Sequence, residues 1–427
     1  MENPKPPHRR SFLQTVLAGG AVAATANLTI MKDLFAQAGG PIRIGHHCDL
    51  TGVISSWGYW HDIAAQKAVA MINKQGGIAG RKVELVTEDT ESNPAAGARK
   101  IRNLIQRGGA EFVVGSVHSG VMLSAIPIAS ELKTPYFSTG EATEATGSKG
   151  TRYSFRTGTD TYSISSACIP WCYENLGKVW TIIYADYAWG QSTREESQRV
   201  IEKLGGKVLK TIPVPLDTKD FVPYIAQIPD NTEVVLPAFI GALSVAFYTQ
   251  AKTMGLDKRA KMFSSSASME SIAPSDIEGA AEGGYFLENF PRQLKHKNDE
   301  FHREFLQQIG IDEVDAREKG GKRVMDKSHG WQAWEDVFAI KQAIETSGYK
   351  TRKDMEGALR ALEGLHMKNS LGHPSGDKMI RKEDHAGILD CYISRVENGK
   401  FEVKKRIPKE ELAKNMPLRH DLSKLKA

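Results

Sequence analysis

The sequence predicts an α/β protein with two lobes, each built on a doubly wound parallel sheet. Three observations support this prediction. The chain has 427 residues, which is too long for one ordinary compact domain. Apolar strand-like segments alternate with helical ones from Pro41 onward, and the same rhythm restarts after Arg156. With 41% hydrophobic and 25% charged residues, the composition is that of a globular protein.

The first lobe begins with a regular alternation of strands and helices. Strands are expected at 42–46, 82–86, 112–115 and 136–138, and helices at 63–72 and 94–107. A glycine pair stops each of these helices, as is typical of helix C-termini. Because helices connect successive strands, the sheet should be parallel, with helices on both faces.

The second lobe repeats this pattern before the alternation breaks down. Strands are expected at 179–184, 208–212, 234–237 and 262–264, with a helix at 192–204. In the last third of the chain, helices are expected at 299–309, 330–346 and 353–362. A hairpin of 388–396 with 400–403 then follows around Asn398-Gly399, a type I′ turn signal. We therefore expect one lobe to hold residues 39–158 and 289–365, and the other 159–288 and 366–427.

The first 38 residues predict an export signal. Arg9 to Gln14 resembles a twin-arginine motif, an uncharged stretch covers 11–31, and Ala36-Gln37-Ala38 suits a cleavage site. A membrane anchor is the alternative, but the stretch holds many polar residues and glycines. The longest later uncharged run, 234–251, is interrupted by a proline and a glycine. We expect a periplasmic protein whose mature chain has no membrane span.

Charge and motifs exclude several function classes. There are 56 Lys and Arg residues against 51 Asp and Glu residues, and this small excess predicts no nucleic-acid partner. The dinucleotide, phosphate-loop, zinc-protease and serine-hydrolase motifs are all absent. We therefore expect neither an enzyme nor a cofactor.

The cysteines and the histidine pair do not indicate a disulfide framework or a metal site. Cys48, Cys168, Cys172 and Cys391 are expected to be buried free thiols, although an exported protein could pair them in three ways. His46-His47-Cys48-Asp49 looks like a metal cluster, but adjacent strand residues point to opposite faces. No metal site is predicted there.

Ligands of open α/β sheets bind beyond the carboxyl ends of the strands, which selects four loops. All four are rich in Gly, Ser or Thr and precede a helix; they are 50–58, 115–120, 138–143 and 186–190. Their N–H groups and hydroxyls suit a carboxylate or amide, although simple N-capping gives the same pattern. Trp57 and Trp189 lie in two of these loops and could clamp a flat or apolar ligand across a cleft. Trp331 and Trp334 have helical spacing and should be core.

Several segments resemble the periplasmic branched-chain amino-acid and amide binding proteins. The resemblance covers roughly 42–400 and is carried by these segments: Leu50-Thr51-Gly52, the stretch from Asn73 to Val86, Phe155-Arg156-Thr157, Tyr184-Ala185-Asp186, Trp189-Gly190 and Glu282-Gly283. The stretch from Asn73 to Val86 is the most specific. The resemblance implies a type I two-lobed fold with three hinge strands, capture of a small ligand, and delivery to the permease subunits of an ABC importer.

The resemblance also implies a set of ligand-binding residues. Trp57 falls on a pocket aromatic, Ser119 on a carboxylate-binding serine beside His118, and Trp189 on a pocket tyrosine. The remaining implied positions are Gly140 and Ala142 at the ligand head, and Phe239 and Ile240 near a second aromatic.

Two departures from the family bear on the ligand. Ala142 stands where the family's amino-acid binders have a threonine, and Ser265 or Ser266 where they have an acidic residue. An unpaired ammonium in a closed cleft costs several kcal/mol, which disfavours a standard amino acid. Glu141 could supply the charge instead. Otherwise the ligand is an amide, a urea-like compound or an aromatic acid.

The sequence thus predicts an exported solute-binding component of an importer. A periplasmic sensor of the same fold, acting through a partner protein, is the main alternative, and an exported enzyme is a weaker one.

Overall fold

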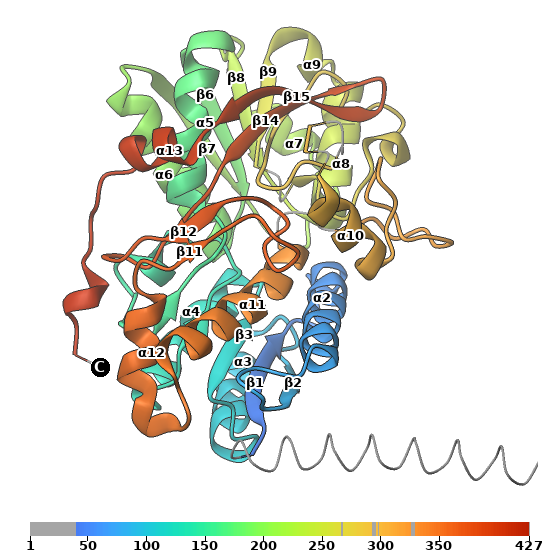
Figure 1. Ribbon diagram of the computed structural model, residues 1–427. Coiled ribbons are helices and arrows are strands. Elements are labelled where there is room, and N and C mark those ends of the chain that lie inside the picture. The colour runs from blue at the N-terminus through green and yellow to red at the C-terminus, as the bar shows by residue number, and fades with distance from the viewer. Residues whose placement is uncertain (1–39, 266–267, 293–295, 298, 326–328, 427) are drawn as a thin grey trace, which may run out of the picture.

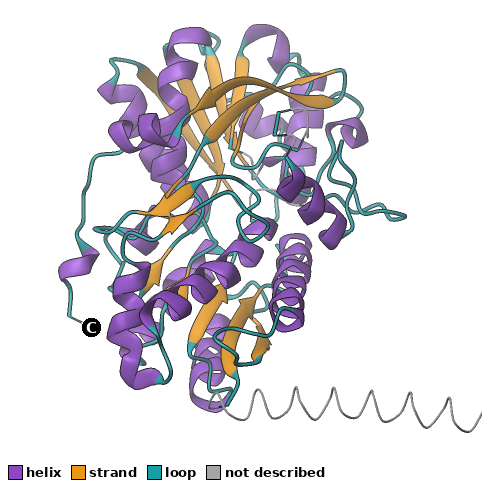
Figure 2. Cartoon of the chain, in the orientation of Figure 1, coloured by secondary structure: helices purple, strands orange, loops and turns teal. Residues whose placement is uncertain are grey.

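The computed structural model describes residues 40–265, 268–292, 296–297, 299–325 and 329–426. The predicted export signal lies outside these residues, and so does Ser266. A parallel sheet in the lower half of Figure 1 and a mixed sheet in the upper half form the framework, and helices flank both (Figure 2).

The first sheet has five parallel strands in the order β2-β1-β3-β4-β5. Their bounds are Ile42–Cys48 (β1), Val83–Asp89 (β2), Phe112–Gly115 (β3), Tyr136–Phe137 (β4) and Ser154–Phe155 (β5). The early helices are Ser55–Lys74 (α2), Pro94–Arg102 (α3) and Ser119–Glu131 (α4). The predicted helix 94–107 is present, but its last five residues, Asn103–Arg107, form a π-helical turn.

Two later helices complete this half of the protein. α11 (Gly330–Ser347) packs on α2 and β3, and α12 (Met355–Leu362) packs on α11. Trp331 and Trp334 are buried among them, as expected from their spacing. We call the five-stranded sheet and these helices the first unit.

The second sheet has seven strands in the order β15-β14-β10-β9-β8-β6-β7. Their bounds are Val179–Ala185 (β6), Lys207–Val214 (β7), Val234–Ala238 (β8), Lys261–Ser264 (β9), Tyr285–Glu288 (β10), Cys391–Glu397 (β14) and Lys400–Ile407 (β15). β6 to β10 pair in parallel, whereas β14 and β15 pair antiparallel. Asn398 and Gly399 both have positive φ, 52° and 73°, which matches the predicted hairpin turn.

The helices around this sheet complete the second unit. They are Thr161–Asn175 (α5), Ala188–Lys203 (α6), Val222–Ile225 (α7), Gly241–Thr253 (α8), Leu256–Arg259 (α9) and Lys409–Asn415 (α13). All four cysteines are buried free thiols, as expected.

A small antiparallel sheet lies between the units in the view of Figure 1. Its strands are His366–Met367 (β11), Lys378–Ile380 (β12) and Gly387–Ile388 (β13). α10 (Glu300–Ile309) contacts α2 of the first unit. Within the ranges that the structure describes, no helix is long and apolar enough to cross a membrane.

Candidate functional site

A narrow cavity of about 20 Å³ lies where the two units meet. It is lined from the first unit by Ile54, Trp57, Val117 and His329, and from the second unit by Tyr187, Trp189 and Ile240. Each of these residues follows a strand or begins a helix, which is where open α/β sheets bind ligands. The cavity has the space of about one water molecule, so the side chains of the two units nearly fill it in this structure.

Two buried carboxylates from opposite units reach the indoles of this cavity. Trp57 Nε1 donates to Glu270 Oε2 at 2.6 Å, and Trp189 Nε1 donates to Glu141 Oε2 at 2.9 Å. Glu141 belongs to the first unit and Glu270 to the second, so each bond joins the two units. Burial, with Glu141 nearby, raises the pKa of the Tyr187 phenol above its usual range.

His329 lies between the two carboxylates. Its Nδ1 is 2.6 Å from Glu270 Oε2, and its Nε2 is 3.7 Å from Glu141 Oε1. The imidazole reaches this position because it directly precedes α11. Two carboxylates therefore approach the same imidazole from opposite units, an arrangement that suits a positively charged group.

Asp49, at the end of β1, holds the loop that follows β3. Its buried Oδ2 accepts hydrogen bonds from Ser116 Oγ at 2.6 Å, Val117 N at 2.8 Å and His118 N at 3.1 Å. A buried carboxylate needs several donors to offset its lost hydration. Asp49 thereby fixes Val117 against the cavity.

A second loop, 138–142, is tied to the first. Gly140 N donates to Ser116 O at 2.8 Å, and Ala142 N donates to Ser119 Oγ at 3.2 Å. A Cβ at Gly140 would lie 2.7 Å from Val117 O, so this close approach requires glycine. Buried Arg156 donates to the carbonyls of Gly140 and Ala142 and so presents Glu141 to the cavity.

The structure brings together most of the residues predicted for the site. Trp57, Trp189 and Ile240 line the cavity, and Glu141 bonds to Trp189. His118 caps α4 and lies with its ring centroid 5.5 Å from that of Tyr187.

Of the other predicted residues, Phe239 and Ser265 also lie outside the cavity lining. Phe239 packs on Phe221 and Phe247 in the core of the second unit. Ser265 is buried. Their contact with a ligand stays a prediction.

Sequence reasoning missed Glu270 and His329. The expected acidic position fell on Ser265 or Ser266, a few residues before Glu270. Glu270 is the only acidic residue between Lys261 and Asp276, and this could have identified it. His329 follows residues without periodicity, and no local pattern singles it out.

The histidine-rich end of β1 behaves only partly as expected. The four residues 46–49 do not converge, since His47 bonds to Tyr136 and Gly97 while Asp49 faces the loop after β3. However, His46 and Cys48 are two residues apart and share one face of the strand, where His61 of α2 joins them. Alternation along the strand separates His46 from His47 but leaves His46 and Cys48 on the same face, where a helix residue distant in sequence completes the group.

The comparisons agree with the two-unit architecture. A family model described as periplasmic binding protein matches residues 41–400, and the chain belongs to this family. It is 24% identical over 245 residues to the Leu/Ile/Val-binding protein homolog 8 of Brucella abortus (strain 2308). That match covers 55% of this chain and 60% of the relative, so the chain spans less than two thirds of it.

Two solved structures show the same fold. One is an ABC transporter solute-binding protein from R. palustris in complex with benzoate, with a TM-score of 0.74 and 18% identity. That match covers 86% of this chain and 97% of the other. The second is a leucine-binding protein from Thermotoga maritima, with a TM-score of 0.71 and 21% identity over 87% and 99% of the two chains. The predicted type I periplasmic binding protein fold is therefore confirmed.

Proposed function

We propose that this protein is the exported solute-binding component of an ABC importer. It acts in the periplasm, captures a small ligand between two lobes and delivers it to the permease subunits. The lobes are residues 39–158 with 289–365, and 159–288 with 366–427. The family match and the resemblance to ABC transporter solute-binding proteins support transport over the sensor alternative.

The two carboxylates beside the cavity are the observation that favours an amino-acid-like ligand. Glu141 and Glu270 approach the same region from opposite units, and both bond to indoles that line it. A ligand with an ammonium group gains charge-assisted hydrogen bonds with these carboxylates, which an aromatic acid without an amino group cannot form. Of the ligand classes open from the sequence, the amino-acid-like class is favoured.

Glu270 changes the argument against an amino acid. That argument rested on a serine at the family's acidic position in the second lobe. Glu270 comes from the same strand-to-strand connection, between β9 and β10, and its carboxylate is 2.6 Å from Trp57 Nε1. We assign to it the role of ammonium partner, with Glu141 as a second acceptor.

Contacts across the cavity account for closure. Trp57, from the first unit, bonds to Glu270 and lies against Gly241 at the start of α8, where an added Cβ would be 3.3 Å from the indole. A ligand shifts closure only as far as its affinity differs between the open and closed states. A molecule that touches both Trp57 and Trp189 binds the closed state better.

A thermal-shift panel tests this proposal. The full chain is screened with branched-chain amino acids, small amides, urea and aromatic carboxylates. A ligand at 100 times its Kd adds about 2.7 kcal/mol of stability. We expect amino acids to raise the Tm. Stabilisation by aromatic carboxylates alone would contradict the assigned ligand class, and no stabilisation by any compound would contradict the solute-binding role for these ligands.

A further inference from the structure

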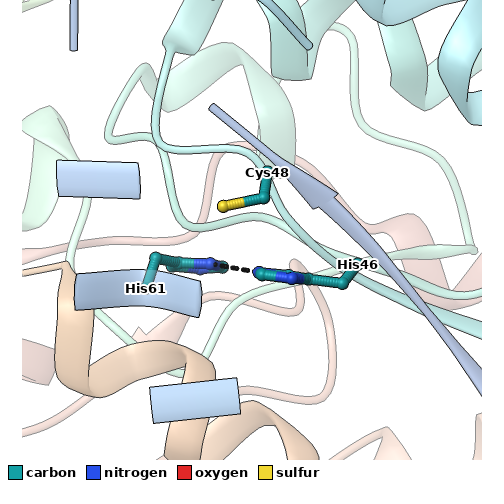
Figure 3. A group of neighbouring side chains, drawn as sticks. All are labelled: His46, Cys48 and His61. Carbon is teal, nitrogen blue, oxygen red and sulfur yellow. Dashed lines mark hydrogen bonds between the residues drawn. The ribbon is translucent and has the colours of Figure 1, made fainter. Parts of the chain in front are cut away.

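A second polar cluster lies inside the first unit, outside the cavity lining. It consists of His46 and Cys48 from β1 and His61 from α2, and one ligand atom from each lies within 4.8 Å of the other two (Figure 3). The three residues are 0%, 1% and 1% exposed. Two imidazoles and a thiol are seldom found together in a hydrophobic interior.

The close approach of α2 to β1 creates the cluster. A Cβ at Gly58 would lie 1.9 Å from Asp49 O, so only glycine permits this approach. His61 then meets His46, with His46 Nε2 and His61 Nδ1 2.9 Å apart. Their centroids are 5.1 Å apart and their planes differ by 10°, so with facing nitrogens the rings lie edge to edge.

The outward ring nitrogens are held by other side chains. His46 Nδ1 is 3.4 Å from Asp62 Oδ1 and 3.3 Å from Thr87 Oγ1, and His61 Nε2 is 3.0 Å from Thr139 Oγ1. Metal-binding histidines characteristically donate their outer N–H to a carboxylate or another oxygen, which fixes the tautomer. The two inner nitrogens are therefore held facing each other, and the Cys48 sulfur lies within 4.8 Å of a nitrogen of each ring.

We propose that His46, Cys48 and His61 bind one thiophilic metal ion, Cu⁺ or Zn²⁺. Imidazole and thiolate are the donors that these ions prefer. Cu⁺ with one thiolate is neutral, and Zn²⁺ with one thiolate is neutralised by the Asp62 carboxylate against His46. Neither ion therefore leaves an unpaired positive charge in the interior.

Uptake requires little movement and releases one proton. Bonds of about 2.0–2.3 Å to a shared ion place donor atoms roughly 3.3–3.9 Å apart, so the two nitrogens separate slightly and the sulfur moves inward. The Sγ–H bond of Cys48, which now points to Gly58 O at 3.3 Å, breaks as the Sγ–metal bond forms, and its proton leaves to solvent. The imidazole that carries the proton between the two rings shifts it to its outer nitrogen, His46 Nδ1 or His61 Nε2, where Asp62 or Thr139 accepts it.

Metal content of the full chain tests this proposal. The protein is produced with Cu⁺ or Zn²⁺ supplied during expression and, in a second arm, during refolding, and bound metal is counted by mass spectrometry. We expect one equivalent of one ion in the wild type. Cys48→Ser and His61→Asn should each weaken binding by at least about 100-fold in competition with a chelator. Cys391→Ser, which removes a buried thiol of β14, should keep the wild-type stoichiometry.

X-ray absorption spectroscopy on the metal-loaded wild type identifies the atoms bound to the ion. It therefore tests the proposal even if a variant of the cluster does not fold. One sulfur and two nitrogens around the ion support the proposal. The proposal is overturned if the ion has no sulfur ligand or if Cys48→Ser still binds one equivalent of metal. It is also overturned if the wild type binds less than one equivalent in both the expression and the refolding arm. None of these readouts depends on an imported ligand, so failure here leaves the solute-binding proposal standing.

Discussion

Asp49→Asn tests how the loop beside the cavity is held. The carboxylate accepts three hydrogen bonds on Oδ2, from Ser116 Oγ, Val117 N and His118 N. A hydrogen bond to a charged group contributes about 1.5–3 kcal/mol, against about 0.5–1.5 kcal/mol for a neutral pair. The amide keeps the shape and loses the charge, so three weakened bonds should lower the free energy of unfolding by about 2–4 kcal/mol.

Urea denaturation followed by circular dichroism measures this loss. Asp230→Asn is the matched control, because its side chain is fully exposed and such changes usually stay within about 0.5 kcal/mol. If Asp49→Asn loses no more than the control, the loop does not depend on the carboxylate, and the account of how Val117 is positioned is wrong.

Three further predictions concern the site and its surroundings. Glu270→Gln should weaken binding of any amino acid found in the panel by about 10–100-fold in calorimetry, because one charge-assisted contact is lost; exposed Glu195→Gln should not. Gly140→Ala should cost about 1–3 kcal/mol in urea denaturation, because its Cβ meets Val117 O at 2.7 Å; a cost near zero would refute the tight contact. Burial lowers the pKa of His373 from 6.5 to about 3, so the unfolded chain binds a proton that the folded chain does not. Stability from this group is full above pH 6.5 and falls as the pH drops toward 3, by about 2 kcal/mol at pH 5. A His373→Gln variant should lose less stability between pH 7 and pH 5 than the wild type, and an equal loss would contradict the assignment.

The regular elements were predictable because their signals are local. The strand at Phe112–Gly115, the hairpin turn at Asn398-Gly399 and the buried Trp331 and Trp334 follow from short apolar periods and turn chemistry. The two indoles of the cavity were also predictable, since each comes shortly after a strand and beside a glycine in the sequence, although both lie in the first turn of a helix, α2 or α6, and not in a loop. Local patterns of this kind need no knowledge of the distant chain.

The polar partners of the cavity were not predictable in the same way. Glu270 and His329 lie 59 residues apart, and each follows a stretch without periodicity. The contact of Glu270 with Trp57 spans 213 residues and exists only because the two units face each other. The pairing of His46 and Cys48 with His61 likewise depends on how closely α2 approaches β1, which a strand pattern does not encode.

Calorimetry with matched pairs tests the central claim most directly. The full chain is titrated with L-leucine and with isocaproate, which lacks the amino group, and then with L-phenylalanine and hydrocinnamate. The account predicts that at least one amino acid binds and that its deaminated partner binds at least 10-fold more weakly, since the Glu141 and Glu270 carboxylates recognise the ammonium. Equal or tighter binding of the deaminated acids would contradict it.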